Sequence, residues 1–187
     1  MQNMTEQLVL TVVAHDRPGI IRALAAAVAE HGGNWVDSSM ARLGGEFAGI
    51  LQVALPAGNV AALEAALASL ADSGISVTAR RSVVGAEPPK GRRVFIELTG
   101  ADHPGIVAEI SGEIARLGAS IDELTTRVFA GSMSGTAMFE ANADVILPDG
   151  LDEGEVREKL EDLADDLMVE IDVELPGERK EASFRKA

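Results

Sequence analysis

The chain has 187 residues, of which 47% are hydrophobic and 25% charged, a composition typical of a folded globular protein rather than a disordered one. Its 16 basic and 30 acidic residues give a net charge of −14, which argues against direct nucleic-acid binding, because phosphate backbones need cationic partners. The absence of cysteine excludes disulfides, thiolate nucleophiles and cysteine metal sites.

The N-terminal segment carries no basic stretch ahead of its short apolar run. The chain also lacks the run of about 20 apolar residues that a membrane-spanning helix needs. We therefore expect a cytoplasmic protein without membrane contact. A chain of this length fits one large domain or two small ones.

The first predicted strand is the apolar run LVLTVVA at 8–14. A helix should follow, with Pro18 in its first turn and Asp16 capping its free backbone donors. Apolar residues recur at every fourth position along this helix until the glycines at 32 and 33, which are typical of a helix end.

Two further strands should form a hairpin around Gly44 and Gly45, because paired glycines permit a tight turn. An alanine-rich helix is predicted from Val60 onward, and a last strand at 75–83. The predicted order of elements is strand, helix, strand, strand, helix, strand.

The same order then starts again after a linker. We expect a first domain at 1–84, a Pro/Gly linker at 85–92, a second domain at 93–176 and a mobile charged tail at 177–187. Asn34 aligns with Ser120 when the two repeats are matched.

Both repeats place the pattern Asp-x-Pro-Gly between a strand and a helix, as HDRPGII at 15–21 and DHPGIV at 102–107. Farther along, Phe47 matches Phe139, so the second hairpin is longer than the first. A pattern that recurs in matching frames is stronger evidence than one occurrence. The repeats predict an α+β fold of two ferredoxin-like (βαββαβ) sandwiches in tandem, each a four-stranded antiparallel sheet with two helices on one face.

An open sheet face and free sheet edges need cover, which favours pairing of the two copies within the chain or in a homodimer. The fold alone does not specify a function, since binding, catalytic and sensing proteins share it.

The apolar strand, the Asp-x-Pro-Gly-Ile loop, the helix and the start of the second strand at Asn34 resemble the ACT domain, a small amino-acid-sensing module. The resemblance covers about 7–83 and 93–175. Two such units without a further domain look most similar to the glycine cleavage system transcriptional repressor group, and the stretch 34–56 is the most similar part.

The resemblance implies that an amino acid binds where the strand-to-helix loop of one unit faces the second strand of a partner unit. A glycine at the helix start lets backbone N–H groups approach a carboxylate, and the helix dipole favours negative charge there. An aspartate of the loop would receive the ligand's ammonium group. The residues so assigned are Asp16, Arg17, Pro18, Gly19, Ile20, Asn34, Trp35, Asp102, His103, Pro104, Gly105, Ile106, Ser120 and Ile121.

Asp followed by Pro-Gly is also common turn chemistry without any ligand, so a loop that serves only folding is the alternative. The second repeat departs from the first, because Ser120 follows alanine rather than glycine and His103 replaces Arg17. We therefore expect that one of the two sites either binds no ligand or has a different ligand specificity.

No catalytic, metal or cofactor site is predicted. His15 and His103 stand beside aspartates, but their spacing is not that of a metal site, and we interpret them as surface residues. The chain has neither a Gly-x-Ser-x-Gly elbow nor a phosphate-binding Gly-x-x-x-x-Gly-Lys motif.

We interpret the chain as a non-catalytic sensor of glycine or a similar small amino acid. The resemblance implies that its protein partner is a DNA-binding regulator. The alternative is a regulatory subunit or ACT segment that controls a separate enzyme of amino-acid metabolism. A pair of RNA-recognition domains of the same topology is disfavoured, because the chain has no tyrosine, one tryptophan and a negative charge.

Overall fold

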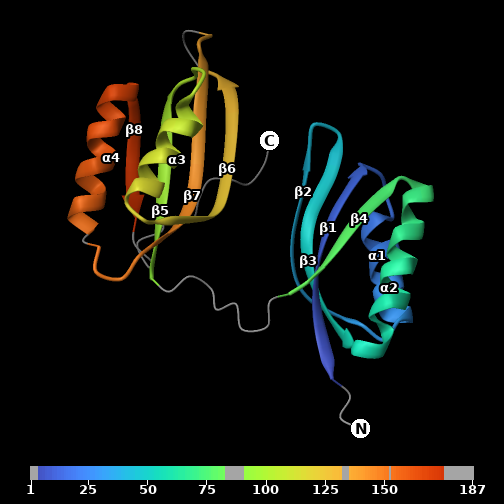
Figure 1. The fold of residues 1–187 in the computed structure, drawn as a ribbon. Coiled ribbons are helices and arrows are strands. Elements are labelled where there is room, and N and C mark those ends of the chain that lie inside the picture. The colour runs from blue at the N-terminus through green and yellow to red at the C-terminus, as the bar shows by residue number, and fades with distance from the viewer. Residues whose placement is uncertain (1–3, 83–90, 132–134, 152, 175–187) are drawn as a thin grey trace. The chain divides into compact units, whose positions relative to one another are not determined.

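The computed structural model describes residues 4–82, 91–131, 135–151 and 153–174. It divides into two compact units, Met1–Ala86 and Glu87–Ala187, called unit 1 and unit 2 below (Figure 1). The predicted linker falls mostly outside the described residues, and the predicted tail falls wholly outside them.

Unit 1 is a four-stranded antiparallel sheet with helices on one face. Its sheet order is β2-β3-β1-β4. The 3₁₀ turns Ala57–Asn59 and Leu70–Ser73 flank the second helix. The elements are β1 (Thr5–His15), α1 (Ile20–Glu30), β2 (Asn34–Leu43), β3 (Glu46–Pro56), α2 (Val60–Ser69) and β4 (Ile75–Arg81).

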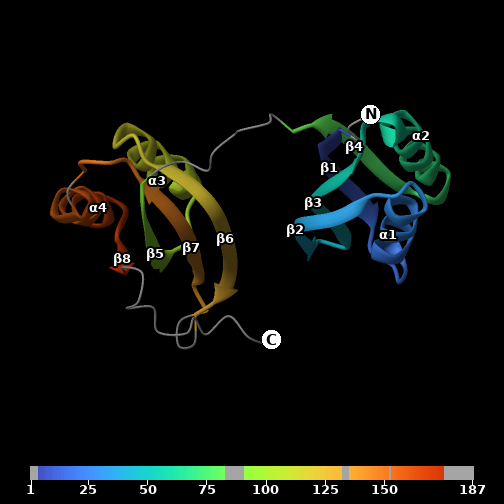
Figure 2. The ribbon, with the colours of Figure 1, turned by 90° about the horizontal axis from the view of Figure 1, so that it is seen from below.

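Unit 2 repeats this topology with the sheet order β6-β7-β5-β8. Figure 2 shows that in each unit both helices lie on the same side of the sheet. The fold class predicted from the sequence, two α+β sandwiches in tandem, is confirmed. The elements are β5 (Arg92–Ala101), α3 (Ile106–Arg116), β6 (Ser120–Ala130), β7 (Ala137–Leu147), α4 (Glu153–Leu167) and β8 (Val169–Glu174).

The core of each unit lies between the helices and the inner face of the sheet. In β1 the alternate residues Leu8, Leu10 and Val12 are fully buried, while the residues between them face away from the helices. Alternation of this kind follows from the two-residue period of a strand. The apolar run of β1 is thus buried on one face only within unit 1, and its outer face is partly exposed at Val13.

The hairpins of the two units differ in length but share an irregularity. β2 and β3 are joined across Gly44 and Gly45, both at positive φ, as the paired glycines predicted. β6 and β7 are separated by 131–136, of which 132–134 lie outside the described residues. The pairing register shifts after Trp35 in unit 1 and at the matching Ile121 in unit 2, so the two hairpins are equivalent in register.

Within the described part of the chain, no helix is long and apolar enough to cross a membrane.

Candidate functional site

The two Asp-x-Pro-Gly segments occupy the same place in the two units, between the first strand and the first helix of each. They are called loop 1 (Asp16–Gly19) and loop 2 (Asp102–Gly105) below. Gly19 has φ 99° and Gly105 has φ 102°, and each is the residue immediately before its helix. L side chains rarely adopt such a conformation, which explains glycine at both positions.

The predicted capping of α1 by Asp16 is wrong. The N-cap position is occupied by Gly19, and no side-chain cap is present there. Pro18 also lies outside the helix, in the turn before it, and not in the first helical turn as predicted. The helix starts two residues later than expected because the Pro-Gly pair forms a turn of its own.

Loop 1 is held by three polar contacts. The Asp16 N–H donates to the Gly45 carbonyl at 2.9 Å, and the Arg42 guanidinium donates to the Asp16 carboxylate at 3.0 Å. The Arg17 guanidinium donates to the Ser73 carbonyl at 2.7 Å. An adjacent carboxylate and guanidinium present both signs of charge beside the helix start, which suits a zwitterion.

Sequence reasoning did not single out Arg42. It lies on β2 and reaches loop 1 across β3, because the end of β2 is level with the end of β1: Glu46 of β3 pairs with His15 on one side and Leu43 on the other. The only available signal was the tight hairpin at Gly44, which fixes this register.

Loop 2 has a different electrostatic character. The Asp102 N–H donates to the Ala137 carbonyl at 2.9 Å, which corresponds to the Asp16 contact in loop 1. Val128 occupies the position matching Arg42, so β6 offers Asp102 no guanidinium at this position. A carboxylate oxygen of Glu109 lies 3.3 Å from where a Cβ on Gly105 would stand. Loop 2 is therefore the more acidic of the two.

The structure does not bring the second-strand residues to the loop of their own unit. Asn34 pairs with Ala54 of β3, and Ala54 pairs on its other side with Gln7 near the start of β1. Loop 1 follows the opposite end of β1. Since a strand rises about 3.3 Å per residue, the two ends of β2 are roughly 30 Å apart. Ser120 lies at the corresponding far end of unit 2, where it pairs with Ile146.

Four of the predicted apolar residues contribute to the cores. Ile20 and Ile106 are 2% and 3% exposed, so only their backbone can meet a ligand. Trp35 and Ile121 pack against the cores of unit 1 and unit 2 as partly buried side chains. Pro18, Pro104 and His103 remain near the surface, and the His103 ring contacts the Pro104 carbonyl at 3.3 Å.

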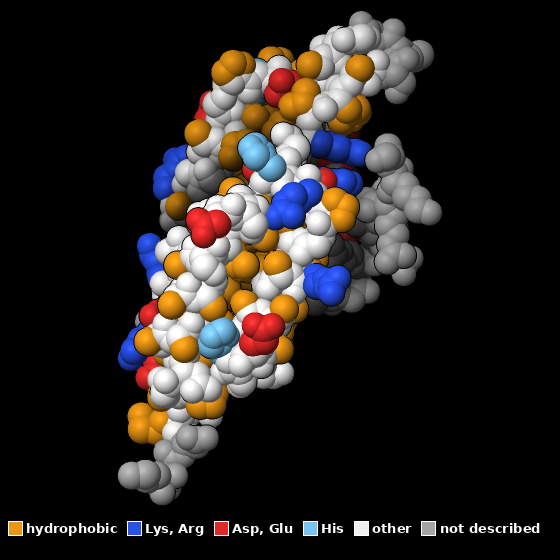
Figure 3. Space-filling model, turned by 90° about the vertical axis from the view of Figure 1, so that its right-hand side faces the viewer, with side chains coloured by type: hydrophobic (Ala, Val, Ile, Leu, Met, Phe, Trp, Pro, Cys, Tyr) orange, Lys and Arg blue, Asp and Glu red, His pale blue; other side chains and the backbone are white. Residues whose placement is uncertain are grey.

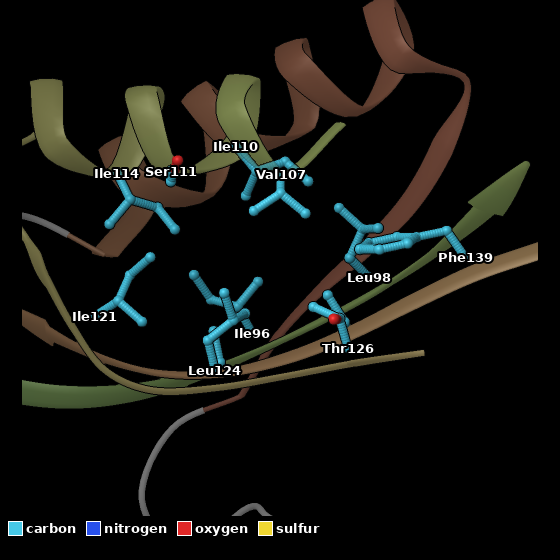
Figure 4. Close-up of a pocket in the computed structure, with 12 residues that line it drawn as sticks. Ile96, Leu98, Val107, Ile110, Ser111, Ile114, Ile121, Leu124, Thr126 and Phe139 are labelled. Carbon is cyan, nitrogen blue, oxygen red and sulfur yellow. The ribbon is translucent and has the colours of Figure 1, made fainter. Parts of the chain in front are cut away.

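Unit 2 contains an apolar groove between α3 and the edge strand β6, called the groove below (Figure 4). Its cavity volume is only about 30 Å³, room for about one water molecule. In Figure 4, Ile110 and Val107 of α3 face Leu124 and Thr126 of β6 across the space. The lining residues are Ile96, Leu98, Val107, Ile110, Ser111, Ile114, Ile121, Leu124, Thr126, Phe139, Ala141 and Ala143.

The histidines are engaged in local contacts. His15 lies 2.5 Å from a Glu46 carboxylate oxygen at the surface, and the His31 ring contacts the Ala27 carbonyl at 2.7 Å. No group of three His, Asp or Glu side chains suited to a metal ion occurs among the described residues.

On the face drawn in Figure 3, basic and acidic side chains are interspersed and form no continuous basic surface.

Comparison with known proteins identifies both units. Residues 6–79 and 92–174 each match the model of the ACT domain. The glycine cleavage system transcriptional repressor of Escherichia coli (strain K12) is 27% identical over 121 residues, 64% of each chain. The present chain thus spans 64% of that relative's length.

Two solved structures match most of this chain. An unknown protein from Galdieria sulphuraria is 31% identical with a TM-score of 0.78, over 92% of this chain and 99% of that one. A candidate glycine cleavage system transcriptional repressor has a TM-score of 0.71 at 20% identity, over 92% of this chain and 98% of that one. At 20% identity the second likeness concerns the fold alone.

Proposed function

Because the chain belongs to the ACT domain family, we propose that it is a non-catalytic regulatory protein. In this proposal it senses glycine or a similar small amino acid and acts through contacts with another protein. The similarity to the E. coli repressor supports a role in transcriptional regulation. The net charge of −14 argues against direct contact with DNA, so the regulated target would be a DNA-binding protein.

The observation that carries the proposal is the pair of loops. In both units a glycine at positive φ immediately precedes a helix that no side chain caps. The N–H groups of a first helical turn have no partner within the helix, and together with the helix dipole they favour a carboxylate. Apart from its chain neighbours, no described residue has an atom within 4 Å of where a Cβ on Gly19 would stand, so a ligand can approach the backbone of loop 1.

Loop 1 supplies complementary charges for a zwitterion. The Asp16 carboxylate would receive the ammonium group, and the Arg42 guanidinium, 71% exposed, is free to turn toward a carboxylate. Charge-assisted hydrogen bonds are about twice as strong as neutral ones, which favours a charged ligand over a neutral one of the same size. Unit 1 is therefore the better candidate for a glycine-sized ligand.

Binding would be transmitted as a shift between states of the protein. A ligand shifts such an equilibrium only by its differential affinity for the two states. A ligand held between Asp16 and Arg42 would replace their mutual ion pair, which connects loop 1 to β2. The position of the loop relative to that edge strand would then report occupancy to a protein partner.

Calorimetry with the full chain and each common amino acid tests the proposal. We expect Asp16→Ala to weaken binding roughly 10- to 100-fold, because it removes a charged hydrogen-bond partner. Gly19→Val should abolish binding, because its side chain blocks the approach to the loop backbone. Gly58→Ala is the matched control, since that glycine has open space around it and an ordinary φ.

If no amino acid gives heat of binding or a shift in melting temperature, the sensing proposal fails and a scaffold role remains. Turnover of an amino acid by the purified chain would contradict the non-catalytic assignment. Affinity capture in the presence and absence of ligand would distinguish a DNA-binding regulator from an enzyme of amino-acid metabolism as the partner.

A further inference from the structure

The outer face of unit 1 is the side of its sheet opposite α1 and α2 (Figure 2). The strand registers arrange its residues in rows that cross the sheet in the order β2, β3, β1, β4. Two central rows carry no charge, and Ile50 and Val13 are 53% and 46% exposed in them. From β2 to β4 these rows read Ser39, Ile50, Thr11, Thr78 and Ala41, Ala48, Val13, Ser76.

The neighbouring row places opposite charges at its two ends. From β2 to β4 it reads Asp37, Gln52, Val9, Arg80. Asp37 and Arg80 are three strand spacings apart, about 14 Å, so they cannot form an ion pair within one unit. The Asp37 carboxylate accepts from the Ser38 N–H at 2.7 Å, and no described residue forms an ion pair or side-chain hydrogen bond with Arg80.

A hollow lies beside Asp37 on this face. Its cavity volume is about 240 Å³, the space of about eight water molecules. Val9 and Ile50 line it with apolar surface, and Asp37 lines it with a carboxylate. A long basic side chain fits this combination, because its stem can lie along apolar surface while its charged head meets the carboxylate.

A second copy of unit 1 supplies such a side chain if the two outer faces meet. Aligned sheets pack face to face with their strands within about 30° of each other. A twofold axis along the strands, midway between β3 and β1, places Arg80 of one copy over Asp37 of the other, and the symmetry repeats this contact. The same axis brings Ala48 of one copy against Val13 of the other, so the uncharged rows meet in the centre.

The size of the face is sufficient for such a contact. Four strands about 4.8 Å apart and about 30 Å long cover roughly 600 Å², so two copies would bury roughly 1,200 Å². Specific interfaces bury about 1,200 to 2,000 Å². The outer face of unit 1 is at the lower end of this range, which predicts a weak, concentration-dependent dimer.

The equivalent row of unit 2 does not permit the same pairing. From β6 to β8 it reads Glu123, Asp144, Phe95, Glu174. The same twofold axis would place Glu174 of one copy against Glu123 of the other, and like charges in contact are unfavourable. Because the chain has a net charge of −14, two copies approach most readily where their surfaces are neutral or complementary.

We propose that two copies of the chain associate through the outer faces of unit 1, with Arg80 of each copy inserted into the hollow beside Asp37 of the other. The inference goes beyond amino-acid sensing and does not rest on it, because none of the three rows contains a residue of loop 1 or loop 2.

Sedimentation velocity of the full chain from about 1 μM to about 500 μM tests the proposal. We expect the wild type to change from monomer to dimer with a dissociation constant of roughly 1 to 100 μM. Asp37→Arg and Arg80→Asp should each weaken self-association at least about 100-fold, because each brings like charges together at both ends of the contact. Asp37→Arg makes the chain less negative and Arg80→Asp makes it more negative, so a loss in both does not follow from net charge.

An equal mixture of the two variants gives the sharpest result. In a mixed dimer the Asp37→Arg copy faces the Arg80→Asp copy, which restores opposite charges at both ends. We expect association of the mixture to return to within about tenfold of the wild type, although neither variant dimerises alone. Variants that had lost their fold would not recover on mixing.

Glu123→Arg, at the position of unit 2 that matches Asp37, is the control and should leave self-association within about twofold of wild type. Fluorescence of Trp35 during urea unfolding shows whether unit 1 of each variant is folded. A wild type that stays monomeric over the whole range overturns the inference, and so does a dimer that Asp37→Arg leaves intact. Failure of the mixture to associate overturns it as well. None of these outcomes affects the proposal of amino-acid sensing, which calorimetry tests separately.

Discussion

The outer sheet faces of the two units, opposite the helices, share one register but differ in chemistry. In unit 1, Thr11 lies between Ile50 and Thr78. In unit 2 the equivalent Glu97 lies between Asn142 and Asp172. The inner faces of both units are apolar, whereas the centre of the outer face is neutral in unit 1 and acidic in unit 2.

This comparison teaches that the inner face of a sheet is constrained by packing, whereas the outer face is free to serve association. The outer face of unit 1, where exposed Val13 and Ile50 stand among few charged residues such as Arg80, suits contact with another apolar surface. The acidic outer face of unit 2 suits a basic partner or open solvent. Substitutions at equivalent positions test whether the two units also differ in the packing of their cores and hairpins.

The largest expected effect concerns packing under the first helix. Leu24→Ala should cost about 3 kcal/mol, because Leu24 is fully buried. The equivalent Ile110→Ala should cost about 2 kcal/mol or less, since Ile110 already borders the groove. Hydrogen exchange of the full chain, measured unit by unit, gives both values. Equal costs would mean that the groove is closed in solution.

The next largest effect on stability is expected where β2 and β3 approach each other closely, at Gly49. A Cβ on Gly49 would lie within 2.4 Å of the Ser39 carbonyl oxygen, whereas unit 2 has Ala141 at this position. We expect Gly49→Ala to destabilise unit 1 by about 2 kcal/mol, since the backbone has to move. Fluorescence of Trp35, the only tryptophan of the chain, follows urea unfolding of unit 1.

The reciprocal change Ala141→Gly should cost unit 2 only about 0.5 to 1 kcal/mol, from chain entropy. Similar costs for both substitutions would show that the two hairpins are packed alike, contrary to the structure.

A smaller effect is expected from the acidic outer face. Glu97 and Asp172 are directly opposite each other on neighbouring strands and both exposed. Asp172→Thr should stabilise unit 2 by about 0.5 kcal/mol, because like charges opposite each other are unfavourable. The gain should vanish near 1 M salt, where screening extends to about 3 Å. Thr78→Asp in unit 1, opposite an uncharged threonine, should change little.

The smallest effect on stability is predicted for the ion pair of loop 1. Arg42→Ala should change the free energy of unfolding by less than about 0.5 kcal/mol, because the pair is solvent-exposed. Local hydrogen exchange at loop 1 should nevertheless accelerate, while loop 2, which has Val128 instead, should not respond. A large loss of stability would show that the ion pair stabilises the fold and is not readily replaced by a ligand.

The sequence predicted the tandem βαββαβ fold and the position of nearly every element, because periodicity and glycine positions are local signals. It also predicted the doubled loops, since Gly19 and Gly105 mark backbone at positive φ. It placed Asp16 as a helix cap because a side chain at that spacing often caps, but Arg42 engages the carboxylate instead. That contact depends on pairing across a hairpin, which no local pattern encodes.

By itself the sequence determined the order of the strands and helices and their approximate extent, because hydrophobic spacing must match the backbone period. Only the tertiary structure decided that Asn34 and Ser120 lie far from the loops of their own units, and that a small apolar groove lies between α3 and β6. Distances of this kind follow from strand register and from the combined volume of side chains on separate elements, so they appear only when the elements are packed together.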